Sequence, residues 1–313
     1  MAAKLSSIGA RRGAAAPTVR ASIDAFLAAP RNRRSPHTQR AYANVLDRLS
    51  AVIGTDRVLA GVTEAEIAAA LEQLWGDAAP ATWNQRRTAV GSWLSWCVLA
   101  QRWDAPPLPA AAERRRENTD STQSVDAAVI DRLCRDRRIP LRERTLWRLL
   151  YETASRAAAV LALNIEDLDL ANKRARIVQK GGDTIWLHWG TDSAHLLPRL
   201  IGGRTSGPLF LSSRRPGPHR SATTDPRDID AATGLVRLGY DRARILAGEH
   251  AGLRLHQLRH SAATHLAEAG AGTTIIMAKT GHKSLRSVQR YARPGTAAVA
   301  EATALLSRPP RRG

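Results

Sequence analysis

Four residues toward the C-terminal end of the sequence could together act on a phosphate diester. His256 and Arg259 are three residues apart in the segment HQLR, and residues at this spacing project from one face of a helix. Breaks at glycines follow, and they would let His282 and Tyr291 fold back toward that face. An arginine can clamp a phosphate, a histidine can donate or carry a proton, and an activated tyrosine hydroxyl is a nucleophile. The pattern therefore predicts covalent chemistry at a phosphate.

A metal site is the alternative interpretation of the histidines. His256 and His260 are four residues apart, so both could lie on one helix face. However, no third cysteine, histidine or carboxylate stands at a fitting spacing, and the HExxH pattern is absent. The sequence therefore predicts a site without metal, in which His260 has a structural or supporting role.

The composition indicates a polyanionic partner. Lys plus Arg total 47 against 28 Asp plus Glu, which gives a formal net charge of +19 over 313 residues. This excess favours nucleic acid, although a generally arginine- and alanine-rich proteome would also produce a basic protein. The length suits two domains, each of which can bury a core of its own.

Two features predict the compartment. Cys97 and Cys134 stand within apolar helical patterns, which is typical of buried thiols in a reducing compartment and not of a disulfide framework. No apolar run approaches the roughly 18 residues of a membrane helix, and no signal peptide opens the chain. We therefore expect a soluble protein of the cytoplasm, with no membrane partner.

The first half of the chain predicts a small bundle of helices. Residues 1–17 are small and basic and are expected to be flexible. Residues 18–103 contain four or five amphipathic stretches with recognisable start signals, which would pack together through their apolar faces. Their tryptophans are expected in the core and not stacked on bases. The start signals are Thr18, the pair Ser35-Pro36, and the capping box of Thr63 with Glu66; the tryptophans are Trp83, Trp93, Trp96 and Trp103.

Residues 104–123 have the composition of a linker, rich in proline and then charged and polar. The run Arg114, Arg115 and Arg116 could lie along DNA, but a solvated run of charges is the default interpretation.

The remainder, 124–313, predicts a second domain that is mostly helical. Two stretches with helical periodicity precede three short strand-like runs at 165–170, 175–179 and 184–189, which would form a small antiparallel sheet. A further helix is expected over 228–245, and a last amphipathic helix begins after Thr296.

The ordered set H-x-L-R-H, then Gly-His, then a tyrosine nine residues later resembles the active-site box of the tyrosine recombinase (phage integrase) family. The resemblance covers nearly the whole chain. It implies a two-domain, C-shaped DNA clamp, made of an α-helical, SAM-like core-binding domain and a mostly α catalytic domain with a small antiparallel β-sheet.

The resemblance also implies a catalytic set. The segment YETASRAAAV is similar to the family's box around its first catalytic arginine, and VQKGGD is similar to the β-turn that carries its catalytic lysine. It implies that the tyrosine forms a 3′-phosphotyrosyl bond, that two arginines and the second histidine stabilise the phosphate, that the lysine protonates the leaving oxygen, and that the first histidine assists proton transfer. These residues are Tyr291, Arg156, Arg259, His282, Lys180 and His256.

The resemblance further implies the partners. Neither a metal nor a nucleotide cofactor is needed, because the bond energy is kept in the phosphotyrosine. The partner would be double-stranded DNA with a specific recombination site, bound by a homo-tetramer on two sites, with a monomer or weak oligomer when free. The basic start of the last helix in the first domain would contact DNA through Gln85, Arg86 and Arg87.

Four positions depart from the family pattern, and two alternatives remain open; Ala159 and the irregular strand after the lysine turn keep the second of them open. Ala154-Ser155 replace the usual Gly-Leu, Ala159 replaces an acidic residue, TIWLHW follows the lysine turn, and Thr280 replaces a leucine. A type IB topoisomerase would share the site chemistry but act as a monomer. A DNA-binding regulator with a decayed site would keep only the affinity for DNA.

Overall fold

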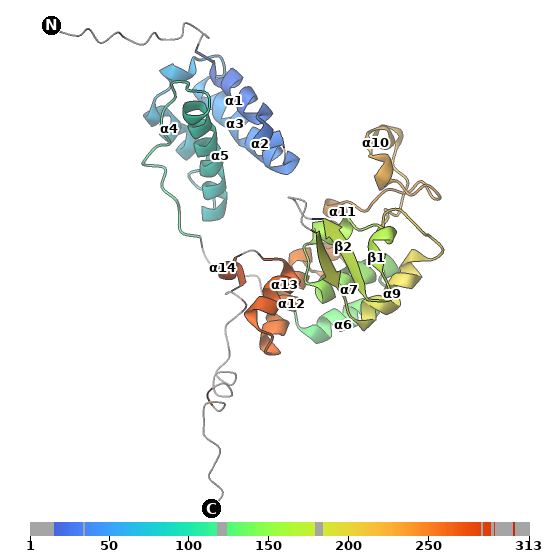
Figure 1. Ribbon diagram of the computed structural model, residues 1–313. Coiled ribbons are helices and arrows are strands. Elements are labelled where there is room, and N and C mark those ends of the chain that lie inside the picture. Colours follow the sequence, from blue (N-terminus) through green and yellow to red (C-terminus); the bar gives the residue numbers. More distant parts are fainter. Residues whose placement is uncertain are drawn as a thin grey trace, which may run out of the picture. The chain divides into compact units, whose positions relative to one another are not determined.

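The computed structural model describes residues 16–33, 35–117, 124–178, 184–282, 284–288, 291 and 303. The chain forms two compact units, Met1–Ser121 and Thr122–Gly313 (Figure 1). Each is described by itself below.

Five helices form the described part of the first unit, and two of them, α1 and α4, begin at cap residues expected from the sequence. The Thr18 hydroxyl accepts a hydrogen bond from the Ala21 N–H at 3.2 Å, and Thr63 forms a complete capping box with Glu66. The third helix begins at Pro36, as predicted, and ends at Gly54, whose φ of 101° few other residues adopt. The helices are α1 (Val19–Ala28), α2 (Pro30–Arg33), α3 (Pro36–Ile53), α4 (Glu64–Trp75) and α5 (Pro80–Leu99), with a 3-10 turn at Leu59–Gly61.

The core of the first unit is aliphatic and aromatic. Trp93 and Trp83 are buried, and Trp96 packs its ring edge-on against Phe26 and Trp103, with ring centroids 5.6 and 5.7 Å apart. The prediction that the tryptophans serve the core is confirmed. These large rings belong to the apolar core of the first unit together with side chains of α1 and α3.

The segment 104–117, within the expected linker, packs against the first unit. Ala112 is buried in its core. The Trp83 indole N–H donates to the Glu113 carbonyl at 2.8 Å, and the Asn84 side chain bonds both the N–H and the carbonyl of Arg115, at 2.9 and 2.8 Å. In a solvated linker these backbone groups would bond to water. Here they form hydrogen bonds with side chains of α5.

The second unit surrounds one buried helix, α7 (Leu141–Thr153). It packs against α6, α9 and α12, close to the sheet (Figure 1). Its buried Arg148 is compensated by Asp131 at 2.5 Å and by Asp192 at 3.4 Å, as a charge in a core requires. The other helices are α6 (Ala127–Arg135), α8 (Ala157–Leu161), α9 (Thr191–Ile201), α10 (Pro218–Thr223), α11 (Tyr240–Ala251), α12 (Leu255–Glu268), α13 (Thr273–Thr280) and α14 (Leu285–Val288), with 3-10 turns at Ile165–Asp167 and Pro226–Asp228.

The sheet has three antiparallel strands in the order β1-β2-β3, namely β1 (Leu168–Asp169), β2 (Arg174–Val178) and β3 (Thr184–His188). Ala175 pairs with Leu187, and both side chains face the core. On the opposite face Arg174 lies over the ring of Trp186, 4.3 Å from its centroid. A mostly helical fold with a small antiparallel sheet is confirmed.

The helix expected over 228–245 is a correction. Only α11, from Tyr240, is helical. Residues before it form two isolated bridges, Ile229 with Val236 and Leu211 with Arg237. The chain turns between them because Gly234 adopts a φ of 69° and the Asp230 carboxylate accepts from the Thr233 N–H at 2.9 Å. This side-chain bond competes with a helix, and helical periodicity alone does not reveal it.

Both cysteines are free and buried, as predicted. Burial raises the pKa of the Cys97 thiol to about 12 and that of Cys134 to about 11. Neither thiol is therefore in its reactive form at neutral pH. Within the part of the chain that the structure describes, no helix is both long and apolar enough to cross a membrane.

Candidate active site

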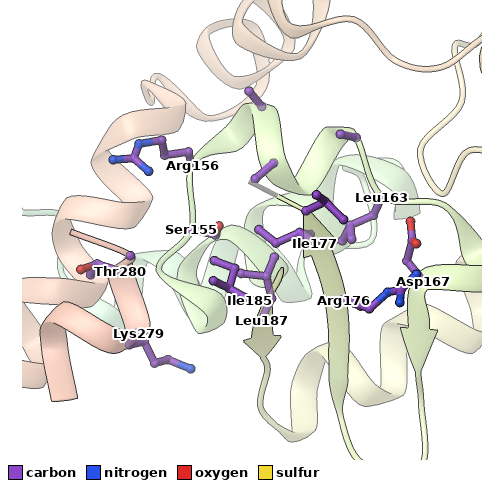
Figure 2. A pocket seen from close by; sticks show the side chains of 15 residues that line it. Ser155, Arg156, Leu163, Asp167, Arg176, Ile177, Ile185, Leu187, Lys279 and Thr280 are labelled. Carbon is purple, nitrogen blue, oxygen red and sulfur yellow. The ribbon is translucent and has the colours of Figure 1, made fainter. Parts of the chain in front are cut away.

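Arg156 is placed by a sharp turn between two helices. Helix α7 ends at Thr153, Ala154 adopts the left-handed conformation with φ 51°, and Arg156 caps the start of α8. An alanine in this conformation is strained by roughly 1 kcal/mol or more relative to glycine. Alanine in place of the family's glycine therefore lowers the stability of this turn. Figure 2 shows the exposed guanidinium of Arg156 extending toward the C-terminal helices.

Arg259 joins three segments of the second unit. It projects from α12, only 2% of it is exposed, and its Nη1 donates to the Ala154 carbonyl at 2.9 Å and to the Thr280 carbonyl at 2.6 Å. Its Nη2 lies 2.9 Å from Nε2 of His282. The guanidinium thus ties the Arg156 turn and the end of α13 to one position.

His282 follows a helix end that fixes its backbone. Helix α13 ends at Thr280, and Gly281 takes the left-handed conformation with φ 66°. The imidazole lies between the Arg259 guanidinium and the Thr280 hydroxyl, with Nδ1 2.7 Å from Thr280 Oγ1. The predicted fold-back of His282 toward Arg259 is confirmed.

Tyr291 is buried, with 5% of it exposed. It packs with Ala263 and Ile276. Its ring centroid is 5.0 Å from that of His260 and 6.1 Å from that of His282. The hydroxyl-bearing side chain therefore lies beside two histidines.

His256 faces a different part of the site. Its side chain is exposed on α12 and lines a cavity of about 220 Å³ together with Arg156 and Arg259. The structure thus brings both arginines and His256 to one cavity. The sequence assigned the proton-transfer role to His256 and a supporting role to His260, whereas it is the His260 ring that packs on Tyr291.

A larger cavity of about 730 Å³ adjoins Arg156. Figure 2 shows Thr280 and Lys279 on its α13 side, Asp167 and Arg176 on the opposite side, and apolar residues of the sheet between them. Ala159 also lines it, so the position of the family's acidic residue opens onto free space. Burial lowers the pKa of the Lys279 ammonium, whose Nζ donates to the His188 carbonyl at 2.8 Å.

Comparisons with known proteins identify the family of the chain. Residues 123–297, more than half of the chain, match the phage integrase family. The chain belongs to the phage integrase, or tyrosine recombinase, family. The tyrosine recombinase XerC of Mycobacterium sp. (strain JLS) is 28% identical over 294 residues, 86% of this chain and 92% of the relative.

Solved structures share the fold. A lambda integrase dimer bound to a COC′ core site matches with a TM-score of 0.65 and 17% identity, over 88% of this chain and 77% of that one. A lambda integrase tetramer bound to a Holliday junction matches with a TM-score of 0.64 and 17% identity, over 88% of this chain and 78% of that one. At this identity the likeness shows the fold alone.

The other candidate residues are Lys180 and the residues expected to contact DNA. Lys180 lies outside the described residues. Gln85, Arg114 and Arg116 are exposed in the first unit. Arg115 is engaged in the fold, because it stacks on Trp83 with its Cζ 4.0 Å from the ring centroid and donates to the Gly76 carbonyl at 2.5 Å.

Two more candidates lie on α5. Arg86 is half-buried, and Arg87 donates from Nε to the Ala112 carbonyl. Among the described ranges, no group of three or more His, Cys, Asp or Glu residues is arranged to hold a metal ion.

Two groups that contact the candidate site residues were not identified from the sequence. The Ala154 carbonyl accepts from Arg259, and the Thr280 hydroxyl contacts His282. The first leaves no sequence signal, because it is a backbone atom. The second had one, since a threonine stands directly before the Gly-His pair where the family has leucine.

Proposed function

We propose that Tyr291 is the nucleophile of site-specific DNA recombination by this chain, with Arg156, Arg259 and His282 around the scissile phosphate. Membership of the tyrosine recombinase family makes the chain an enzyme that cleaves and rejoins DNA. The observation that supports the assignment is the joined set of side chains: Arg259 bonds His282, and the ring of Tyr291 lies against His282.

In the proposed cleavage step the Tyr291 oxygen attacks phosphorus. A bond from the tyrosyl oxygen to the 3′-phosphate forms, and the bond to the 5′-oxygen breaks. Arg156 and Arg259 neutralise charge on the non-bridging oxygens, and His282 donates to the same phosphate. His256 assists removal of the tyrosyl proton, and Lys180 gives a proton to the leaving 5′-oxygen. Religation reverses these steps, so no external energy source enters.

Covalent capture from a DNA library tests this function. Nicked duplexes with a random central segment are incubated with the protein, washed under denaturing conditions, and sequenced. A recombinase recovers covalently bound DNA enriched in one sequence. A type IB topoisomerase would instead recover DNA of many sequences and relax supercoiled plasmid, and a regulator with a decayed site would recover none after denaturation.

The partner is DNA, and we propose that it is bound by four copies of the chain on two sites in the cytoplasm, at the nucleoid. The structural neighbour on a Holliday junction is a tetramer. In this chain α13 and α14 leave Ile275 60% and Leu285 52% exposed. An apolar helix from a neighbouring copy would cover such side chains.

The predicted C-terminal helix would provide that contact. Thr296 can cap it, and Val299, Leu305 and Leu306 give it an apolar strip; apart from Thr303, residues 292–313 lie outside the described residues. A helix this short must bury its strip to be stable.

Truncation after Arg293 should therefore leave single-site DNA binding within about twofold while synapsis of two sites and recombination fall below detection. Gel shifts with one-site and two-site DNA measure both. Normal recombination by the truncated chain would refute docking in a neighbour. Loss of one-site binding together with a lowered melting temperature would show that the helix folds back on its own domain.

DNA affinity should depend strongly on salt, because the chain carries a net charge of +19. Each neutralised phosphate contributes a slope of about −0.9 to a plot of log K against log salt, so six to ten contacts weaken binding roughly 10³- to 10⁵-fold between 50 and 200 mM salt. Fluorescence anisotropy with a labelled duplex measures the slope.

Two neighbouring arginine variants distinguish a residue that contacts DNA from one that stabilises the fold. Arg116→Gln changes an exposed residue and should reduce the slope by about one unit. Arg115→Gln removes the stack on Trp83 and should lower the melting temperature. A slope near zero for the wild type would refute a clamp held by phosphate contacts.

A further inference from the structure

The side chain before the Gly-His pair takes part in a chain of hydrogen bonds that ends at Arg259. Thr280 is 3% exposed, and its Oγ1 lies 2.6 Å from the Ile276 carbonyl and 2.7 Å from Nδ1 of His282. On the other side of the imidazole, Nε2 lies 2.9 Å from Nη2 of Arg259. Each ring nitrogen of His282 therefore lies within hydrogen-bonding distance of a group, the Thr280 hydroxyl or the Arg259 guanidinium, whose role as donor or acceptor can be assigned.

The hydrogen bonds at Nδ1 and at Nε2 of His282 specify the same tautomer. A carbonyl oxygen only accepts, so the Thr280 hydroxyl proton points to Ile276, and the hydroxyl oxygen accepts from Nδ1–H of His282. Arginine only donates, so Nε2 must present its lone pair to Arg259. Each contact points to a neutral imidazole protonated on Nδ1, and the two agree.

We propose that Thr280 is a positioning residue for His282. Its hydroxyl holds the imidazole with Nδ1–H turned away from the reacting phosphate, so that Nε2 beside Arg259 is the nitrogen that gains and loses a proton. This inference rests on the proposed function for its consequence in catalysis, but the tautomer itself does not depend on that function.

The arrangement suits a phosphate-binding histidine. In the neutral ring Nε2 accepts from Arg259, and after protonation Nε2–H can donate to a phosphate oxygen. The bond from Nδ1–H to Thr280 persists in both forms, so the ring does not need to turn when the charge changes. A leucine at this position, as in the family pattern, has no oxygen with which to do this.

The location of Thr280 supports a local role. Figure 2 shows it at the end of α13 on the wall of the larger cavity, on the same side as Arg156. Its backbone carbonyl accepts from Arg259 Nη1 at 2.6 Å, independently of the side chain. Substitution of the side chain therefore removes the hydroxyl contacts and leaves the backbone bond to Arg259 in place.

Two substitutions test the hydroxyl. Thr280→Val keeps the shape and removes the oxygen, whereas Thr280→Ser keeps the oxygen. We expect cleavage of nicked DNA by the valine variant to fall about tenfold and by the serine variant to stay within about twofold. Thr145→Val is the matched control, because Thr145 is also fully buried and donates to the carbonyl four residues earlier, Leu141, at 2.7 Å, yet lines no part of the site.

A double variant separates a positioning role from a general structural one. If Thr280 acts through His282, adding Thr280→Val to a His282→Ala chain should change the cleavage rate by less than about twofold. An additional tenfold loss in that background would overturn the proposal, as would equal losses in the valine and serine variants.

Nitrogen NMR of histidine-labelled protein reads the tautomer directly. The spectrum contains nine histidines, and the signals of His282 are identified by their absence in His282→Gln. The wild type should show a proton on Nδ1, the serine variant the same, and the valine variant a shift toward Nε2–H. A wild-type His282 protonated only on Nε2 would overturn the proposal even if cleavage is normal. A chain that shows the Nδ1–H tautomer but never cleaves DNA would contradict the proposed function alone.

Discussion

Replacement of Tyr291 by phenylalanine is expected to abolish covalent capture of DNA, by at least three orders of magnitude, while DNA affinity stays within about twofold. Only the nucleophilic oxygen is removed, and without it no phosphotyrosyl bond can form. The ring that packs beside His260 and His282 is retained, so the fold of this region should be preserved. A suicide substrate with a nick beside the scissile phosphate, run on a denaturing gel, measures the adduct.

A matched control uses a tyrosine of the same unit. Tyr151 also contacts a histidine, with its hydroxyl 2.8 Å from Nδ1 of His265, but it lies on α7 and outside the proposed site. Tyr151→Phe should leave capture unchanged. Persistence of the adduct in Tyr291→Phe would falsify the assignment of the nucleophile.

Elements whose signals are local could be predicted from the sequence. Thr18 and Thr63 cap helices with hydrogen bonds inside their own first turns, and a turn at residues 170–173 joins β1 to β2. These features depend on residues within a few positions of each other, so composition and spacing reveal them. The candidate site residues were likewise proposed from ordered motifs, most of them within one stretch of the chain.

Features that depend on distant contacts could not be predicted. Residues 104–117 have a linker-like composition, but Ala112 is buried and Trp83 bonds the Glu113 carbonyl about thirty positions away in the chain. The non-helical stretch before Tyr240 is set by bridges to Leu211 and by the Asp230 turn. In each case tertiary contacts override the local preference of the sequence.

The detail of the site was beyond the sequence for a geometric reason. That His282 contacts both Arg259 and Thr280 depends on the left-handed turn at Gly281. The Gly-His pair predicted a break in the helix, but it did not predict the direction in which the imidazole would point. The contact of His260 with Tyr291 likewise joins two residues that are about thirty positions apart in the chain.

Replacement of the two site arginines by lysine should reduce cleavage by roughly two orders of magnitude or more in each case. The expectation follows from the loss of a planar, two-pronged donor at a phosphate. The two variants should differ in stability, however. Arg156 is exposed at the start of α8, so Arg156→Lys should leave the melting temperature unchanged and reduce catalysis alone.

Arg259→Lys should impair both catalysis and folding. The buried guanidinium holds the Ala154 and Thr280 carbonyls and contacts His282, and a lysine ammonium cannot reach all three positions. Loss of buried, charge-assisted hydrogen bonds of this kind costs roughly 2–4 kcal/mol of unfolding free energy.

Single-turnover cleavage and thermal melting, with Arg138→Lys as a control, separate the two effects. Arg138 is an exposed arginine of the same unit, bonded to Asp136 at 2.7 Å, and its replacement should change neither quantity. Near-normal cleavage by Arg156→Lys would remove that residue from the phosphate clamp. An unchanged melting temperature for Arg259→Lys would show that its three contacts do not hold the end of α13 against the Ala154 turn.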